Sequence, residues 1–376
     1  MCDKRYNSHR EKKQGNLNII FLSFRKTFFE SAGAKRTYYQ ASFLNRFEDV
    51  TYLIPKKGIN KNDNNIPTCF GKWSTIVSLI KLRNRHKKNI LIIGTLITLK
   101  EFPYLMCAKI LGYKIVLDKV ENYKYFEDKK SFGNWINIEF GLLLDKWLNF
   151  FADGLLVISS KLNELYAKNN LPVLFMPNSI PIDKINYSSK QQFSKPVKIL
   201  YSGTFGQKEG IELLVRAFLK INTNYKNVEL HLVGKGTIYN ENRIKKEIKD
   251  NNHIIWHGYV TNKRLNKLQI ESDILMMTRI DSKFAQFGFP YKVTEYLTTG
   301  NTIIATNVGD IGNFLLHKVS AVITEPNVKA IYESIVFCLK NNQEALNIGK
   351  NGQIHALKAF NIDLNGKKLI NFLKYL

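Results

Sequence analysis

Apolar residues in the second half of the chain form short continuous runs that alternate with segments of helical spacing. The runs have the length of buried strands and end in glycines or small residues; they span 197–204, 228–236, 253–260 and 272–277. Apolar residues at every third or fourth position predict helices over 210–221 and 263–270. A further, charged helix is predicted after the strand 228–236 and ends at Ile248. This alternation indicates parallel β-α-β units, in which ligands bind beyond the carboxyl ends of the strands.

The first half shows the same alternation. Buried strands are predicted at 17–24, 50–54, 90–94, 114–118 and 155–160, and a helix opens at Ser31 and continues to Phe47. We therefore predict an α/β chain of two Rossmann-like domains with parallel sheets. The segment 177–196 has linker composition. We place the domains at 16–185 and 186–361, between a basic tail predicted to be disordered (1–15) and an amphipathic C-terminal segment (362–376).

Two segments carry candidate contacts for a phosphate. In the predicted helix 291–298, Lys292 and Glu295 are one turn apart and share a face. Lys292 and the free N–H groups there suit a diphosphate, and Glu295 suits the hydroxyls of a ribose; an ordinary surface ion pair is the alternative. Near the start of the first predicted helix, Gly33 lets a donor approach the backbone, or else simply makes a connecting turn.

The order and spacing of several motifs resemble the retaining GT-B glycosyltransferases of the glycosyl transferases group 1 (GT4-like) family. The motifs are Tyr201-Ser-Gly-Thr-Phe-Gly-Gln-Lys-Glu-Gly-Ile211, Leu232-Val-Gly-Lys-Gly236, Trp256-His-Gly-Tyr-Val260, and Thr278-Arg279 followed by Phe289-Pro-Tyr-Lys-Val-Thr-Glu-Tyr-Leu297. The resemblance implies sheets that face across a cleft and a terminal helix that crosses back to the first domain. It also implies sugar transfer from a nucleotide donor, with retention and with no metal or cofactor required.

The same resemblance assigns roles to individual residues. Glu295 matches the family's ribose-binding carboxylate, whereas Phe287 stands where the family has a first glutamate. Arg279 and Lys292 are expected to be catalytic, because they supply the positive charge that stabilises the departing diphosphate. The remaining donor contacts are expected from Gly33, Gly203, Thr204, Lys208 and Tyr259. Glu209 and Gly210 stand where Lys-Gly is common in the family.

Two carboxylates at the end of a strand in the first half are further candidates. Asp118 and Glu121 lie at the end of the predicted strand 114–118 and just after it, so both are expected to point into the cleft. We assign Glu121 to the reacting centre and Asp118 to the acceptor side; helix capping or a solvated loop is the alternative for either. Proton transfer to the leaving phosphate would make a dedicated base unnecessary.

Composition sets limits on the partners. The chain has 376 residues, 44% hydrophobic content and a formal net charge of +25, which calls for an acidic partner such as nucleic acid or anionic lipid. Nucleic acid is disfavoured, because no zinc-ligand spacing or RNA-binding aromatic motif is present. The segment 72–88 is basic and amphipathic. It fits either an anionic membrane surface or a helix packed on the sheet with a solvated charged face.

We therefore expect a glycosyltransferase that moves a sugar from a UDP- or GDP-sugar to a lipid-linked or saccharide acceptor. Cell-surface polysaccharide or glycolipid synthesis would be its setting. The expected location is the cytoplasm, with attachment to the inner face of the cell membrane as a further option. Because the family's first glutamate is replaced by Phe287, the alternative is a catalytically inactive nucleotide-sugar-binding protein on the same scaffold.

Overall fold

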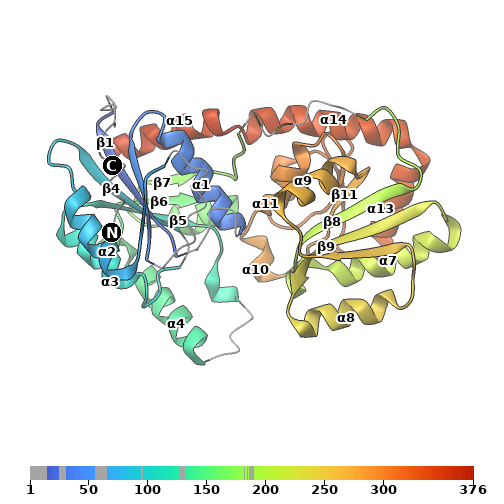
Figure 1. Cartoon of the computed structure of the whole chain (residues 1–376), viewed down its shortest axis with the longest axis horizontal. Coiled ribbons are helices and arrows are strands. Elements are labelled where there is room, and N and C mark those ends of the chain that lie inside the picture. The colour runs from blue at the N-terminus through green and yellow to red at the C-terminus, as the bar shows by residue number, and fades with distance from the viewer. Residues whose placement is uncertain are drawn as a thin grey trace. The chain divides into compact units, whose positions relative to one another are not determined.

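The computed structural model describes residues 15–24, 31–55, 66–94, 96–126, 132–181, 183, 185 and 190–376. The predicted basic tail, apart from Gly15, lies outside this part of the chain, as do residues 182, 184 and 186–189 of the predicted linker. The chain divides into two compact units, one of residues 1–179 with 362–376 and the other of residues 180–361 (Figure 1).

The first unit is built on a seven-stranded parallel sheet of order β3-β2-β1-β4-β5-β6-β7. Its strands are β1 Leu17–Leu22, β2 Asp49–Ile54, β3 Thr68–Phe70, β4 Lys88–Gly94, β5 Lys114–Lys119, β6 Gly154–Val157 and β7 Val173–Phe175. Its helices are α1 Ala32–Leu44, α2 Lys72–Leu82, α3 Phe102–Ile110, α4 Phe132–Lys146, α5 Leu148–Phe151, α6 Ser160–Tyr166 and α15 Ile362–Tyr375, with a 3-10 turn at Tyr123–Tyr125.

The C-terminal helix α15 belongs to the first unit. It packs against α1, and Leu369 and Leu373 are buried in the same core cluster as Phe43 and Leu44. The two helices approach closely at Gly366, where an added Cβ would lie 2.3 Å from the ring of Phe43. A glycine at that position therefore lets α15 seal one face of the sheet.

The second unit is built on a six-stranded parallel sheet of order β10-β9-β8-β11-β12-β13. Its strands are β8 Val197–Phe205, β9 Val228–Gly236, β10 Ile254–Gly258, β11 Ile274–Met277, β12 Thr302–Thr306 and β13 Val322–Thr324. Its helices are α7 Ile211–Asn224, α8 Ile238–Ile248, α9 Asn262–Glu271, α10 Lys283–Gln286, α11 Tyr291–Leu297, α12 Ile311–Phe314, α13 Val328–Lys340 and α14 Asn342–Ala359, with a 3-10 turn at Gln207–Glu209.

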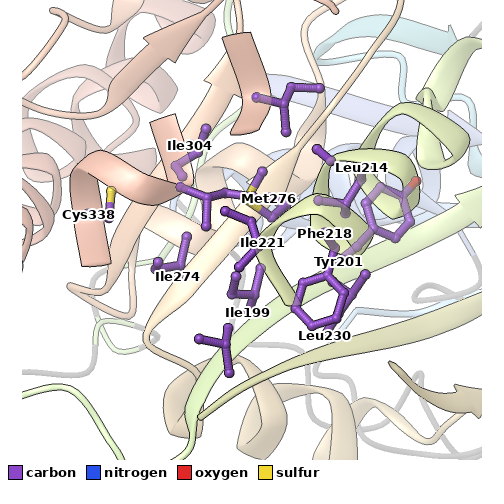
Figure 2. Close-up of a cluster of buried hydrophobic side chains, with 14 of the residues drawn as sticks. Ile199, Tyr201, Leu214, Phe218, Ile221, Leu230, Ile274, Met276, Ile304 and Cys338 are labelled. Atoms are coloured by element: carbon purple, nitrogen blue, oxygen red, sulfur yellow. The ribbon is translucent and has the colours of Figure 1, made fainter. Parts of the chain in front are cut away.

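The core of the second unit lies between β8 and α7. Ile199 and Tyr201 of β8 pack with Phe218 and Ile221 of α7, and Met276 of β11 extends the cluster (Figure 2). The apolar positions of α7 repeat every three or four residues, so a single stripe of that helix covers the sheet. Strand β8 is thereby held by a packed helix and two neighbouring strands, and its carboxyl end pairs with β9 alone among the described strands.

The predicted alternation of strands and helices is confirmed in both units, and the α/β class with parallel sheets is correct. Several boundaries differ by a few residues; for example, the predicted strand 155–160 is Gly154–Val157, and the predicted strand 253–260 ends at Gly258. That glycine has a φ of +65°, a left-handed conformation that does not continue a strand. Within the described residues, no helix is both long enough and apolar enough to span a bilayer.

Candidate functional site

The carboxyl end of β8 is shaped by glycines that permit a close approach of backbone and side chains. Gly203 and Gly234 pair across β8 and β9 and have φ values of +149° and +144°. A Cβ on Gly234 would lie 1.7 Å from the carbonyl oxygen of Gly203. A Cβ on Gly203 would lie 2.6 Å from Nζ of Lys292, so another residue there would displace that ammonium group and adopt a φ that is rare for side-chain-bearing residues.

A buried charged cluster, consisting of Tyr201, Glu209, Arg279 and Lys292, lies at this strand end. Lys292 Nζ donates to Glu209 Oε2 at 2.7 Å and to the Tyr201 hydroxyl at 2.9 Å. Arg279 Nε lies 3.5 Å from Glu209 Oε1. That nitrogen is buried and donates no hydrogen bond within the described part of the chain. A buried donor without an acceptor costs about 1–3 kcal/mol, so an oxygen of a ligand would be favoured there.

The cluster carries an excess of positive charge. Burial alone would raise the pKa of Glu209, but Lys292, Arg279 and Lys208 lower it to about 2. The pKa of Lys292 is also lowered, because burial and repulsion from Arg279 and Lys208 outweigh its attraction to Glu209. Burial is the main cause of the lowered pKa of Lys292, whereas the surrounding cations cause that of Glu209, so three cations face a single carboxylate. An added anion would relieve this imbalance.

Local backbone contacts bring the cluster together. Gly210, with a φ of +62°, turns the chain from Glu209 into α7, and a Cβ there would lie 2.0 Å from the carbonyl oxygen of Thr278. The Thr278 hydroxyl donates to the Glu209 carbonyl at 3.0 Å, and the N–H of Ile280 donates to the Lys208 carbonyl at 3.0 Å. The turn after β8 is thus tied to the segment after β11, which sets Glu209 beside Arg279.

Comparison with known proteins fits this arrangement. Residues 183–355 match the family described as Glycosyl transferases group 1. No curated protein sequence matches the chain. The charged cluster, which lies between Tyr201 and Lys292, is therefore wholly within the group 1 segment.

Solved structures extend the likeness to nearly the whole chain. Anabaena HepE in complex with UDP-glucose matches with a TM-score of 0.73 at 14% identity, over 96% of this chain and 100% of that one. Sucrose-phosphate synthase from Thermosynechococcus elongatus gives 0.72 at 14% identity, over 96% and 98%. A glycosyltransferase from Rickettsia africae gives 0.69 at 15% identity, over 96% and 99%. At these identities the likeness shows the fold, and the predicted GT-B fold class is confirmed.

The other predicted donor residues of the group 1 segment occupy neighbouring strand ends. Lys208 Nζ lies 4.5 Å from the ring centroid of Phe284, and Thr204 is exposed at the end of β8. Tyr259, which is 73% exposed, follows β10 and lies under Lys235 Nζ at 4.9 Å from its ring centroid. Glu295 is half-buried, one helical turn after Lys292 in α11.

The first unit, which lies outside the group 1 segment, contains the remaining predicted site residues. Gly33 is the second residue of α1, and an added Cβ there would meet no atom of the described residues within 4 Å. Glu121 is half-buried directly after β5.

The expectation that Asp118 faces an acceptor is wrong. Its side chain is 1% exposed and is bound by Arg36, whose Nε donates to Oδ2 at 2.9 Å and whose Nη2 donates to Oδ1 at 2.9 Å. Arg36 Nη1 also donates to the carbonyl of Pro177 at 3.0 Å. A buried carboxylate needs a paired charge, and here the partner comes from α1. Asp118 therefore ties α1 to the carboxyl ends of β5 and β7.

Sequence reasoning missed two members of the cluster, Glu209 and Tyr201. The signal for Glu209 was present, since an acidic residue stands where the family commonly has Lys before Gly. A cation from elsewhere had to balance it, and Lys292 does so. The described residues contain no group of three or more His, Cys, Asp or Glu side chains arranged to hold a metal ion. His257 instead hydrogen-bonds His231, with 2.9 Å between Nε2 and Nδ1.

Proposed function

We propose that this protein is a retaining glycosyltransferase that moves a sugar from a UDP- or GDP-sugar to a lipid-linked or saccharide acceptor. One observation supports this function above the others. Lys208, Arg279 and Lys292 surround a single buried carboxylate, Glu209, at the carboxyl end of a parallel sheet. Such a strand end is where ligands bind in these folds, and a diphosphate would balance the excess charge.

In the proposed reaction, the bond between the anomeric carbon and the diphosphate oxygen breaks, and its electron pair goes to the leaving diphosphate. The acceptor hydroxyl forms its bond to the same face of the sugar, and its proton passes to the leaving phosphate. Lys292 and Arg279 stabilise the negative charge that develops on the diphosphate. Since these side chains neutralise the leaving group, the proposal includes no metal and no cofactor.

The donor is proposed to extend from this cluster along the neighbouring strand ends. Glu295 accepts hydrogen bonds from the ribose hydroxyls, one turn after the phosphate-binding Lys292. Gly203, Thr204 and the backbone near Tyr259 flank the nucleotide. Because HepE was crystallised with UDP-glucose, that donor is the first to test. In the first unit, Gly33 and Glu121 are proposed as a donor contact and a catalytic carboxylate.

The acceptor is proposed to be presented at the cytoplasmic face of a membrane, in the synthesis of a cell-surface polysaccharide or glycolipid. The formal net charge of +25 favours association with an anionic surface. Within residues 66–94 there is no Asp or Glu, whereas six cations occur: Lys72, Lys81, Arg83, Arg85, Lys87 and Lys88. Positive segments of this kind are attracted to anionic lipid headgroups.

Nucleotide binding tests the donor site. UDP, GDP, CDP and ADP are added to the wild type and to the Lys292→Met and Glu295→Ala variants, and the melting temperatures are compared. A nucleotide at roughly 100 times its Kd adds about 2.7 kcal/mol, which raises the melting temperature by roughly 5–10 °C. We expect one nucleotide to stabilise the wild type and neither variant. If all four nucleotides leave the wild type unchanged, this donor site is wrong.

A nucleotide-sugar-binding protein without catalytic activity is the second candidate, favoured by Phe287 in place of the family's first glutamate. Turnover separates the two candidates. We expect slow release of UDP from UDP-glucose without acceptor and faster release with membrane extract, and the anomeric configuration of the product tests retention by NMR. A protein that binds UDP tightly but never releases it from the sugar would be the inactive binder.

A further inference from the structure

Helices α4 and α5 of the first unit present an apolar face to solvent. Phe150 is 70% exposed, Trp147 56% and Leu143 51%, and the Trp147 and Phe150 rings contact each other at 6.0 Å between centroids. Leu143 lies in α4, Trp147 in the turn between the two helices and Phe150 in α5, and the ring contact places Trp147 and Phe150 side by side. Lys146, also exposed, is the neighbouring cation. We call these four residues the α4–α5 face.

The opposite side of α4 is firmly anchored, which fixes the direction of this face. Ile138 and Leu148 are buried, and a Cβ on Gly141 would lie 2.4 Å from Leu96 Cγ, so the helix approaches that side chain closely. Asp145 pairs with Lys119 at the end of β5 at 2.5 Å. Because this side of α4 packs inward, the α4–α5 face points away from the core formed by the described residues.

Helix α2, which is linked to α4 through α3, lies in a segment that supplies positive charge. Phe102 of α3 contacts Phe140 of α4 at 5.3 Å between ring centroids, and α3 also packs against α2. The outward side of α2 is itself apolar, since Val77 and Ile80 are exposed while the polar Thr75 and Ser78 are buried. The segment that contains α2 carries six cations and no acidic residue between 66 and 94. Apolar outward faces with surrounding cations are typical of helices that lie in a membrane interface.

We propose that the α4–α5 face inserts into the boundary between headgroups and acyl chains of an anionic leaflet, with the cations of α2 held at the headgroups. Tryptophan is enriched at this depth of bilayers, and Lys146 can extend its ammonium group to the phosphates. Charge complementarity favours lipid over a protein partner, because residues 66–94, which include α2, carry six cations and no acidic residue. This membrane contact would bring the protein to the membrane-bound acceptor of the proposed function. Only that role rests on the proposed function; the contact itself is argued from the exposed residues.

Tryptophan fluorescence tests this insertion directly. The chain has four tryptophans, Trp73, Trp135, Trp147 and Trp256, and each variant retains one of them while the others become Phe. The proteins are mixed with phosphatidylcholine vesicles, with or without phosphatidylglycerol, that carry bromine at known depths of the acyl chains. We expect quenching and a blue shift for the variant that retains Trp147, only with anionic vesicles. The variant that retains Trp256 of the second unit should show neither.

Substitutions then separate the apolar and ionic contributions. The double variant Trp147→Ala/Phe150→Ala should partition into vesicles at least ~10-fold more weakly than the wild type. The double variant Lys81→Ala/Arg83→Ala should lose roughly 5-fold in partitioning for each cation removed, and only on anionic vesicles. Ile354→Ala, which removes an exposed apolar side chain from the second unit, is the matched control and should change nothing.

Unquenched Trp147 on anionic vesicles overturns the inference. A dimer in sedimentation experiments that dissociates in the Trp147→Ala variant also overturns it, because the face would then contact a second copy. Vesicle binding requires neither donor nor turnover, so the two proposals can fail independently. A protein that binds vesicles but no nucleotide would contradict the proposed function and leave this inference intact.

Discussion

Replacement of Glu209 by Gln should destabilise the second unit strongly, although the two side chains have nearly the same shape. The pKa of this carboxyl is lowered from 4.5 to about 2 by Lys292, Arg279 and Lys208. Such a shift corresponds to about 3 kcal/mol of folding free energy at neutral pH. In the variant, three cations face one another without a counter-charge, and the breaking of a buried pair typically costs 3–5 kcal/mol.

Calorimetry at pH 7 provides the assay. For a unit of this size, each kcal/mol lowers the melting temperature by roughly 2–4 °C, so we expect the transition of residues 180–361 to fall by about 6–12 °C. Glu247→Gln is the matched control, because its ion pair with Arg216 lies on the surface and contributes less than about 1 kcal/mol. Inorganic pyrophosphate should then raise the melting temperature of Glu209→Gln more than that of the wild type, since it replaces the missing carboxylate.

The sign of the pH dependence follows from the direction of the shift. A lowered folded-state pKa gives stability that is complete above the unfolded value of 4.5 and is lost as pH falls toward about 2. Urea midpoints of wild type and Glu209→Gln should therefore converge across that window. A variant that melts within ~2 °C of wild type at pH 7 would refute the reasoning, because the cations would then not depend on this carboxylate.

Three further substitutions test other parts of the structure. Gly203→Ala should abolish nucleotide stabilisation, since the added Cβ would lie 2.6 Å from Lys292 Nζ; unchanged binding would contradict the crowding at this strand end. Asp118→Asn should cost about 3–5 kcal/mol in urea unfolding because it leaves Arg36 buried without a counter-charge, whereas a cost below ~1 kcal/mol would restore a solvent-facing role. Gly33→Ala should leave the melting temperature within ~1 °C of wild type, while Gly33→Trp should retain stability and lose donor binding; donor affinity unaffected by Trp would remove Gly33 from the site.

The fold was predictable because its signals are local. Buried parallel strands are continuous apolar runs, and α7 repeats its apolar residues every three or four positions, so neither feature depends on distant contacts. The same holds for Lys292 and Glu295, which share one turn of α11. Order and spacing of these elements were sufficient for the fold class.

The charges of the site were harder to predict because their partners are distant in sequence. Lys292 meets Glu209 across 83 positions, and Asp118 meets Arg36 across 82. Nothing near Asp118 indicates whether it faces solvent or an arginine from another helix, and the assumption of solvent was wrong. Likewise, the pattern of α2 shows a basic amphipathic segment but not which side faces outward. Only packing reveals that Thr75 and Ser78 point inward and Val77 and Ile80 outward.

The crowding of Lys292 against Gly203 constrains how this sequence can change during evolution. Any side chain at position 203 would occupy the space of the ammonium group, and loss of that group would leave Glu209 without its nearest cation. Substitutions at positions 203, 209 and 292 should therefore be tolerated only when they occur together. In a homologue with Lys at position 209, position 292 should carry an uncharged residue, and position 203 should then tolerate more than glycine. Libraries that vary these three codons together should recover those combinations and few single replacements.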